Sequence, residues 1–135
     1  MKLVYVAGPY RASDSWEVEH NVRDAENVGF MIAQFGAVPV IPHTMYRFWN
    51  GTLTDEFWLE ATLDIMRRCD AVVMACDWEF SSGAKAEKQE AERLKIPVFL
   101  STAGGDFEPF QKWLAQSDPK QGVINAMSRF YESQK

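Results

Sequence analysis

Residues 70–100 constrain the fold of this chain more than any other stretch. They contain an apolar run at 70–76, a short polar loop, an amphipathic segment at 83–94 and a second apolar run at 96–100. Continuous apolar runs of this length are typical of strands buried on both faces. Two such strands with a helix between them predict a parallel strand–helix–strand unit, with Gly83 as the turn into the helix.

The rest of the chain repeats this alternation. Residues 2–7 and 37–41 predict two further strands, and Pro39 favours an edge position for the second. Helical spacing of apolar residues predicts a long helix that starts near Asp14, which forms a capping-box pattern with Glu17, and ends at Gly36. Further helices are expected at 54–69, 83–94, 107–115 and 123–131.

These elements predict the α/β class. A chain of 135 residues is expected to form a single domain over residues 1–135. We expect a Rossmann-like or flavodoxin-like domain, with a parallel sheet of four to five strands and helices on both faces.

Composition narrows the range of partners. The net charge of −5 disfavours a nucleic-acid polymer or a membrane surface as the partner. Cys69 and Cys76 flank one strand and are too far apart for a disulfide, so a cytoplasmic protein with reduced thiols is expected. His20 and His43 are the only histidines, and no G-x-G-x-x-G or P-loop motif occurs, so we predict no metal and no cofactor.

Glu87 is the residue that a purely structural helix does not explain. On the helical wheel of residues 83–94 it lies between Ala84 and Ala91, in the middle of the face expected to be buried. A buried carboxylate is costly unless it is paired or used. Its position near the helix N-terminus favours a negative charge, so we expect an ionised carboxylate at the carboxyl edge of the sheet.

Three loops are predicted to meet at that edge, at residues 8–12, 42–47 and 77–83. Ser81 and Ser82, with the backbone N–H groups near Gly83, form a helix-start anion site, and Arg11 adds a planar cationic contact. His43 is read either as a ligand contact or as a structural hydrogen-bonding residue. The combination indicates a phosphorylated or sugar-bearing small molecule. The candidates that carry this prediction are Tyr5, Gly8, Tyr10, Arg11, His43, Ser81, Ser82, Gly83 and Glu87.

Four short motifs carry a family resemblance. They are YVAGPYR at 5–11, NVR at 21–23, CDAVV at 69–73 and SSGAKAE at 81–87, which contains an S-x-G-x-x-x-E pattern. In this order the chain resembles the nucleoside 2-deoxyribosyltransferase-like superfamily over nearly its whole length. It is most similar to small bacterial and phage members, and it also resembles the 2′-deoxynucleoside 5′-phosphate N-hydrolases.

The resemblance implies roles for individual residues. Glu87 would be the catalytic carboxylate that acts on the anomeric carbon of a (deoxy)ribose. Ser81 and Gly83 would hold a 5′-phosphate with help from Arg11. Asn125 would lie near the site of a neighbouring subunit, which, with a surplus of aromatic residues, favours a homodimer or a higher homo-oligomer. The nucleoside pocket itself would be lined by Tyr5, Gly8 and Tyr10.

Three positions decide between the possible activities. Ser81 favours a nucleotide substrate, whereas Asn125 is more similar to the transferases. Thr62 occupies the position of an aspartate that in relatives helps to place the leaving base, and Asp64 lies on another face of that helix.

The main hypothesis is an enzyme: an N-glycosidase that hydrolyses the base–sugar bond of a (deoxy)nucleoside 5′-monophosphate. The alternatives are a deoxyribosyltransferase that exchanges bases and a non-catalytic nucleotide-binding sensor, which Thr62 favours. A purely structural Glu87 stays open as well.

Overall fold

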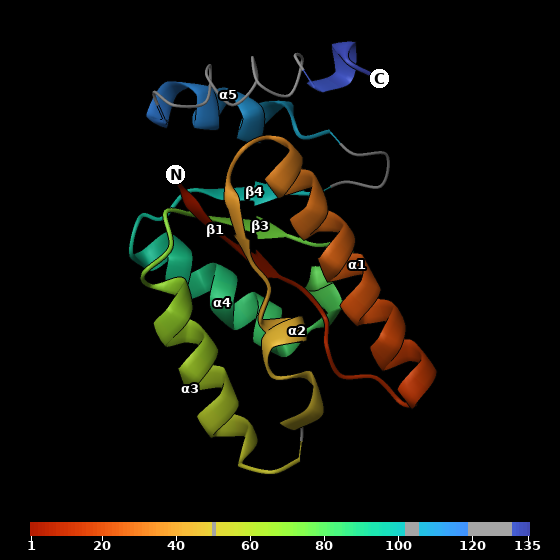
Figure 1. Cartoon of the computed structure of the whole chain (residues 1–135). Helices are drawn as coiled ribbons and strands as arrows, with labels where there is room; N and C mark the ends of the chain where they lie inside the picture. The colour runs from red at the N-terminus through yellow and green to blue at the C-terminus, as the bar shows by residue number, and fades with distance from the viewer. Residues whose placement is uncertain (50, 102–105, 119–130) are drawn as a thin grey trace.

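The computed structural model describes residues 1–49, 51–101, 106–118 and 131–135 (Figure 1). Within them, four parallel strands form one sheet in the order β2–β1–β3–β4, which confirms the predicted α/β class. The predicted edge position of Pro39 is also confirmed, because β2 lies at the end of the sheet. The strands are β1 (Leu3–Ala7), β2 (Val38–Val40), β3 (Ala71–Met74) and β4 (Val98–Leu100).

Helices connect the strands, and two single 3₁₀ turns, η1 and η2, lie in the loops of the described part of the chain. The predicted helices at 14–36, 54–69, 83–94 and 107–115 are present, whereas the one predicted at 123–131 lies almost entirely outside the described residues. One short helix, α2, was expected to be a loop. The elements are α1 (Ser15–Gln34), α2 (Pro42–Met45), η1 (Arg47–Trp49), α3 (Asp55–Met66), η2 (Trp78–Phe80), α4 (Ser82–Arg93) and α5 (Glu108–Ser117).

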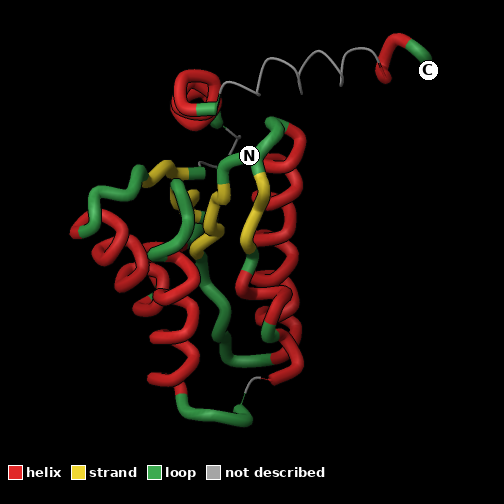
Figure 2. The backbone as a smooth tube through the Cα atoms, turned by 60° about the vertical axis from the view of Figure 1, so that its left-hand side comes forward, coloured by secondary structure: helices red, strands yellow, loops and turns green. Residues whose placement is uncertain are grey.

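Side chains of the two central strands alternate between two apolar cores. Val4 and Val6 of β1 pack with α1 and α5 on one face of the sheet. Tyr5 and Ala7 point to the opposite face, where they pack with α3 and α4. Figure 2 shows α1 on one side of the strands and α3 and α4 on the other. The sheet is therefore covered on both faces, as predicted, and Tyr5 faces the helix that carries Glu87.

The strand order creates a switch point between β1 and β3. After β1 the chain enters α1 on one face, and after β3 it enters α4 on the other face. The loops that leave the carboxyl ends of these two neighbouring strands therefore diverge. Open α/β folds bind their ligands in the crevice that such a divergence leaves. None of the described helices is long and apolar enough to cross a membrane.

Candidate active site

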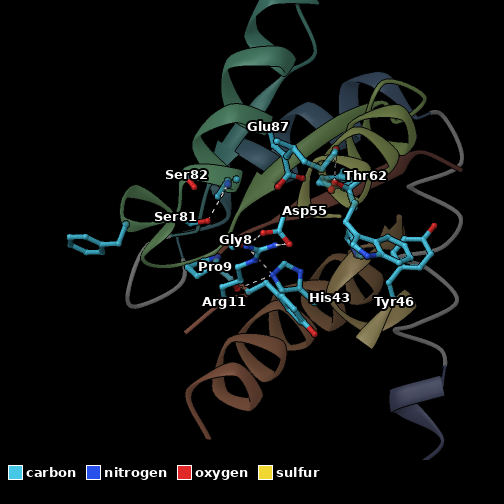
Figure 3. A pocket seen from close by; sticks show the side chains of 18 residues that line it. Gly8, Pro9, Arg11, His43, Tyr46, Asp55, Thr62, Ser81, Ser82 and Glu87 are labelled. Atoms are coloured by element: carbon cyan, nitrogen blue, oxygen red, sulfur yellow. Dashed lines mark hydrogen bonds and ion pairs between the residues drawn. The ribbon is translucent and has the colours of Figure 1, made fainter. Parts of the chain in front are cut away.

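A cavity of about 470 Å³ lies at the carboxyl ends of β1 and β3 (Figure 3). Its volume is within the range of sites for small organic ligands. All of the site residues predicted within the described part of the chain line it. Asn125 lies outside the described residues, so its predicted place near a neighbouring site stays a prediction. The lining is Tyr5, Gly8, Pro9, Tyr10, Arg11, Pro42, His43, Tyr46, Asp55, Trp58, Leu59, Thr62, Phe80, Ser81, Ser82, Gly83, Ala84 and Glu87.

Glu87 occupies the buried face of α4, as the helical wheel predicted. Its neighbours on that face, Ala84 and Ala91, are buried, and Glu87 itself is only 8% exposed. Burial raises the pKa of the carboxyl from 4.5 to about 7, against a lowering contribution from a hydrogen bond with Tyr5. Loss of solvation therefore works against the ionised form of Glu87 that the sequence analysis expected.

Tyr5 links Glu87 to α3. Its side chain is 1% exposed, and its hydroxyl lies beside Glu87 and Thr62, which both affect its pKa. Burial and the neighbouring Glu87 raise the pKa of the phenol well above 10, so Tyr5 stays protonated and donates to the carboxylate. The Thr62 hydroxyl donates to the carbonyl oxygen of Leu59 at 3.0 Å. Oε2 of Glu87 has no hydrogen-bond partner among the described residues.

The turn into α4 is made differently from the prediction. The residue with a positive φ is Asp77 (φ 63°), directly before η2, and Gly83 already lies within α4. A Cβ on Gly83 would have only Ser81 Oγ within 4 Å, at 3.9 Å, so no close approach requires glycine there. Ser81 is the N-cap, and its Oγ accepts from the backbone N–H of Ala84 at 3.1 Å. That bond leaves the Ser81 hydroxyl proton available to a ligand.

Several contacts hold the loop after β1 in place. A Cβ on Gly8 would lie 2.8 Å from the Cβ of Ala75, so the close approach of the two chain segments requires glycine. His43 Nε2 lies 3.1 Å from the carbonyl oxygen of Gly8 and 2.9 Å from that of Pro9. Because both partners are acceptors, Nε2 carries the proton, and burial lowers the pKa of His43. His43 therefore positions the loop while its ring lines the cavity.

Two more hydrogen bonds fix Tyr10. Its hydroxyl donates to the carbonyl oxygen of Arg47 at 3.2 Å. Its own carbonyl oxygen accepts from Asn21 Nδ2 at 3.1 Å, which gives a structural role to the NVR motif at 21–23. The tip of the β1–α1 loop is thus tied both to α1 and to the segment after α2.

Arg11, which follows in the same loop, forms an ion pair with Asp55. Nη1 donates to Oδ2 at 2.5 Å, and Nη2 contacts Oδ1, so the pair is bidentate (Figure 3). The hydrogen bond from Arg11 lowers the pKa of Asp55. Both side chains remain more than half exposed, at 59% and 64%, and both line the cavity.

The sequence analysis named Thr62 of α3 but missed the other residues of this helix that line the cavity. Asp55, Trp58 and Thr62 lie on one face of this helix, and together with Leu59 they line the cavity. Their spacing of three and seven residues was visible in the sequence, but helical spacing alone does not distinguish a face that lines a cavity from one that packs in a core. In the described structure Met66 is the one fully buried residue of α3, whereas Trp58 and Thr62 are half-buried at the cavity.

The described residues contain no group of three or more His, Cys, Asp or Glu side chains that could hold a metal ion. The lining offers the buried carboxylate of Glu87, the phenol of Tyr5 beside it and the N-terminus of α4. Such a set suits attack on, or stabilisation of, an electron-poor carbon.

A family model described as a domain of unknown function (DUF7768) matches residues 2–101. The chain belongs to this family. The matched segment contains every described residue that lines the cavity, from Tyr5 to Glu87. No curated protein matches the sequence of the chain.

Solved structures resemble the fold. One is described as a 2-deoxyribosyltransferase from the psychrotolerant bacterium Bacillus psychrosaccharolyticus, with 20% identity, a TM-score of 0.53, and coverage of 73% of this chain and 70% of that one. Another is described as a 2-desoxiribosyltransferase from Leishmania mexicana, with 20% identity, a TM-score of 0.50, and coverage of 76% of this chain and 66% of that one. The chain thus has the fold of these transferases, as the motifs predicted.

Proposed function

We propose that this protein cleaves the N-glycosidic bond of a 2′-deoxynucleoside-type substrate through Glu87 and passes the sugar to a second base. The observation that carries the proposal is the buried Glu87 carboxylate at the cavity wall, with Tyr5 as a donor beside it. Structures of similar fold are described as 2-deoxyribosyltransferases, which favours base exchange over the hydrolysis that the sequence put first.

The first half of the reaction uses the ionised form of Glu87. A carboxylate oxygen forms a bond to C1′ as the bond from C1′ to the base nitrogen breaks, and that electron pair leaves with the base. The Tyr5 hydroxyl holds the carboxylate by donating to it. Thr62 has no acidic proton near neutral pH, so the departing base takes its proton from solvent.

The second half reverses these steps with a different base. A nitrogen of the acceptor base forms a bond to C1′, the ester bond to Glu87 breaks, and the carboxylate is regenerated. The acceptor nitrogen loses one proton, which balances the proton that the first base took up. The reaction therefore needs no cofactor.

Hydrolysis of a nucleoside 5′-monophosphate is a second candidate, favoured by the start of α4. There the uncharged hydroxyl of Ser81 lies next to backbone N–H groups of the first helical turn. Such a helix start can bind a phosphate group. In this case water would replace the acceptor base. Both candidates share the first half-reaction and the same carboxylate.

Product analysis by HPLC tests the proposal. Wild type, Glu87→Ala and the exposed-site control Glu92→Ala are incubated with 2′-deoxynucleosides and their 5′-monophosphates, with and without a second base. We expect wild type and the control to form a new nucleoside when a second base is added, and Glu87→Ala to form none.

Release of free base without any need for an acceptor would move the assignment to hydrolysis. Binding of these compounds without any product would contradict both candidates and identify a nucleotide sensor, which is the reading that Thr62 favours. Absence of binding as well would leave Glu87 as a structural carboxylate.

A further inference from the structure

The side chains that line the cavity include more acidic groups than basic ones. Among the described residues that line it, Arg11 is the only Lys or Arg, and two carboxylates, Asp55 and Glu87, line it too. The bidentate pair neutralises Arg11 with Asp55. When Glu87 is ionised, the lining therefore carries a net negative charge, which opposes an anionic ligand.

The placement of Asp55 follows from the geometry of α3. Asp55 is the first residue of this helix and Thr62 is seven residues further on, so the two lie on nearly the same face about 10 Å apart along the axis. Thr62 contacts Tyr5 beside Glu87. Asp55 thus lies two helical turns away from Glu87 and Tyr5. It does not take the place of the aspartate that relatives have at the position of Thr62.

Arg11 itself is presented by a fixed loop. His43 holds the carbonyl oxygens of Gly8 and Pro9, and Asn21 holds that of Tyr10. The loop backbone is therefore set, while the guanidinium is mostly exposed and is bound by Asp55. A guanidinium held in a fork recognises a carboxylate and a phosphate by the same bidentate geometry, so the two compete for it.

We propose that Asp55 determines the specificity of the cavity for the 5′ end of its ligand: by occupying Arg11 it favours an uncharged nucleoside over a nucleoside 5′-monophosphate. The proposal deepens the function proposed above and rests on it for the class of ligand. Glu87 and Tyr5 select the bond that is broken, and the Arg11–Asp55 pair selects against a phosphate on the same substrate.

The size of the effect follows from the exposure of the pair. An exposed ion pair contributes little free energy. A phosphate that binds Arg11 in place of Asp55 therefore loses only the small free energy of the Arg11–Asp55 pair. Removing the Asp55 charge is therefore expected to raise the affinity for a 5′-monophosphate about fivefold and to change the affinity for the matching nucleoside less.

Isothermal titration calorimetry with a 2′-deoxynucleoside and its 5′-monophosphate tests the proposal. The variants are Asp55→Asn, Arg11→Ala, the double variant, and Glu56→Gln. Glu56 neighbours Asp55, carries the same charge and does not line the cavity, so it controls for a general change in charge. Of these variants, we expect only the single variant Asp55→Asn to bind the monophosphate more tightly than wild type. The double variant, which also lacks Arg11, is expected to show no such gain.

Equal gains for nucleoside and monophosphate, an equal gain in Glu56→Gln, or a gain that persists without Arg11 would each overturn the proposal. So would failure of Asp55→Asn to bind the monophosphate more tightly than wild type. Because the readout is binding, the outcome is separate from catalysis. An Asp55 effect on a protein that releases no base would contradict the proposed function and leave the specificity role in place.

Discussion

Replacing Glu87 by glutamine is expected to stabilise the protein at alkaline pH. The folded-state pKa of Glu87 is about 7, against an ordinary value of 4.5. At 1.36 kcal/mol per pKa unit, ionising the buried carboxyl costs the folded state about 3 kcal/mol. Below about pH 4.5 the carboxyl is protonated in both the folded and the unfolded state, so it costs no stability. Because the folded-state pKa is raised, the free energy of unfolding falls as the pH rises from there through about 7. Glutamine has a similar shape and carries no such cost.

Urea unfolding of wild type and Glu87→Gln at pH 8 and pH 5 measures the effect. We expect Glu87→Gln to be more stable by about 3 kcal/mol at pH 8 and by less than about 1 kcal/mol at pH 5.

Glu90→Gln, one turn away on α4, is the matched control. Hydrogen bonds from Arg93 and Arg67 lower the pKa of Glu90 from 4.5 to about 2. Its replacement is therefore expected to reduce stability about equally at pH 8 and pH 5, because this contribution is lost only as the pH falls from about 4.5 towards 2. Equal stabilities of wild type and Glu87→Gln at pH 8 would refute the claim that burial raises the pKa of Glu87.

Two further predictions follow from single contacts. If the proposed reaction uses ionised Glu87, kcat/KM for base exchange rises with pH with a midpoint near 7. Tyr5→Phe removes a hydrogen bond that lowers the pKa of Glu87, so the midpoint is expected to move to higher pH. A midpoint that does not move would contradict the role of Tyr5. Gly8→Ala places a Cβ 2.8 Å from that of Ala75 and is expected to cost about 1–3 kcal/mol in denaturant unfolding, partly recovered by Ala75→Gly. Gly83→Ala meets no close atom, so a comparable loss there would refute this steric argument.

The position of Glu87 was readable from the sequence because helical periodicity assigns each residue to a face. Ala84 and Ala91 marked the buried face, and the carboxylate between them had to lie there. Its ionisation was not readable, because the loss of solvation depends on what covers the side chain, which the sequence does not state. Tyr5, on the strand face that packs with α3 and α4, is one of the residues that provide this cover.

Contacts between distant segments were the part that the sequence did not reveal. The sequence analysis gave Asp55 no role and predicted that Arg11, 44 positions away, contacts an anionic group of the ligand. Only the fold brings them together. The same holds for His43, for which the sequence left a ligand contact and a structural hydrogen bond as alternatives. The structural role follows from its contacts with the carbonyl oxygens of Gly8 and Pro9, which only the tertiary structure brings within reach.

The covalent intermediate on Glu87 gives the most direct test of the account. Wild type is mixed with a 2′-deoxynucleoside, quenched with acid, digested and examined by mass spectrometry, with Glu87→Gln beside it. We predict that the peptide containing Glu87 gains the mass of one deoxyribosyl group in wild type and gains nothing in Glu87→Gln. The same adduct on another residue, or equal base release by both proteins, would contradict the assignment of Glu87 as the reacting carboxylate.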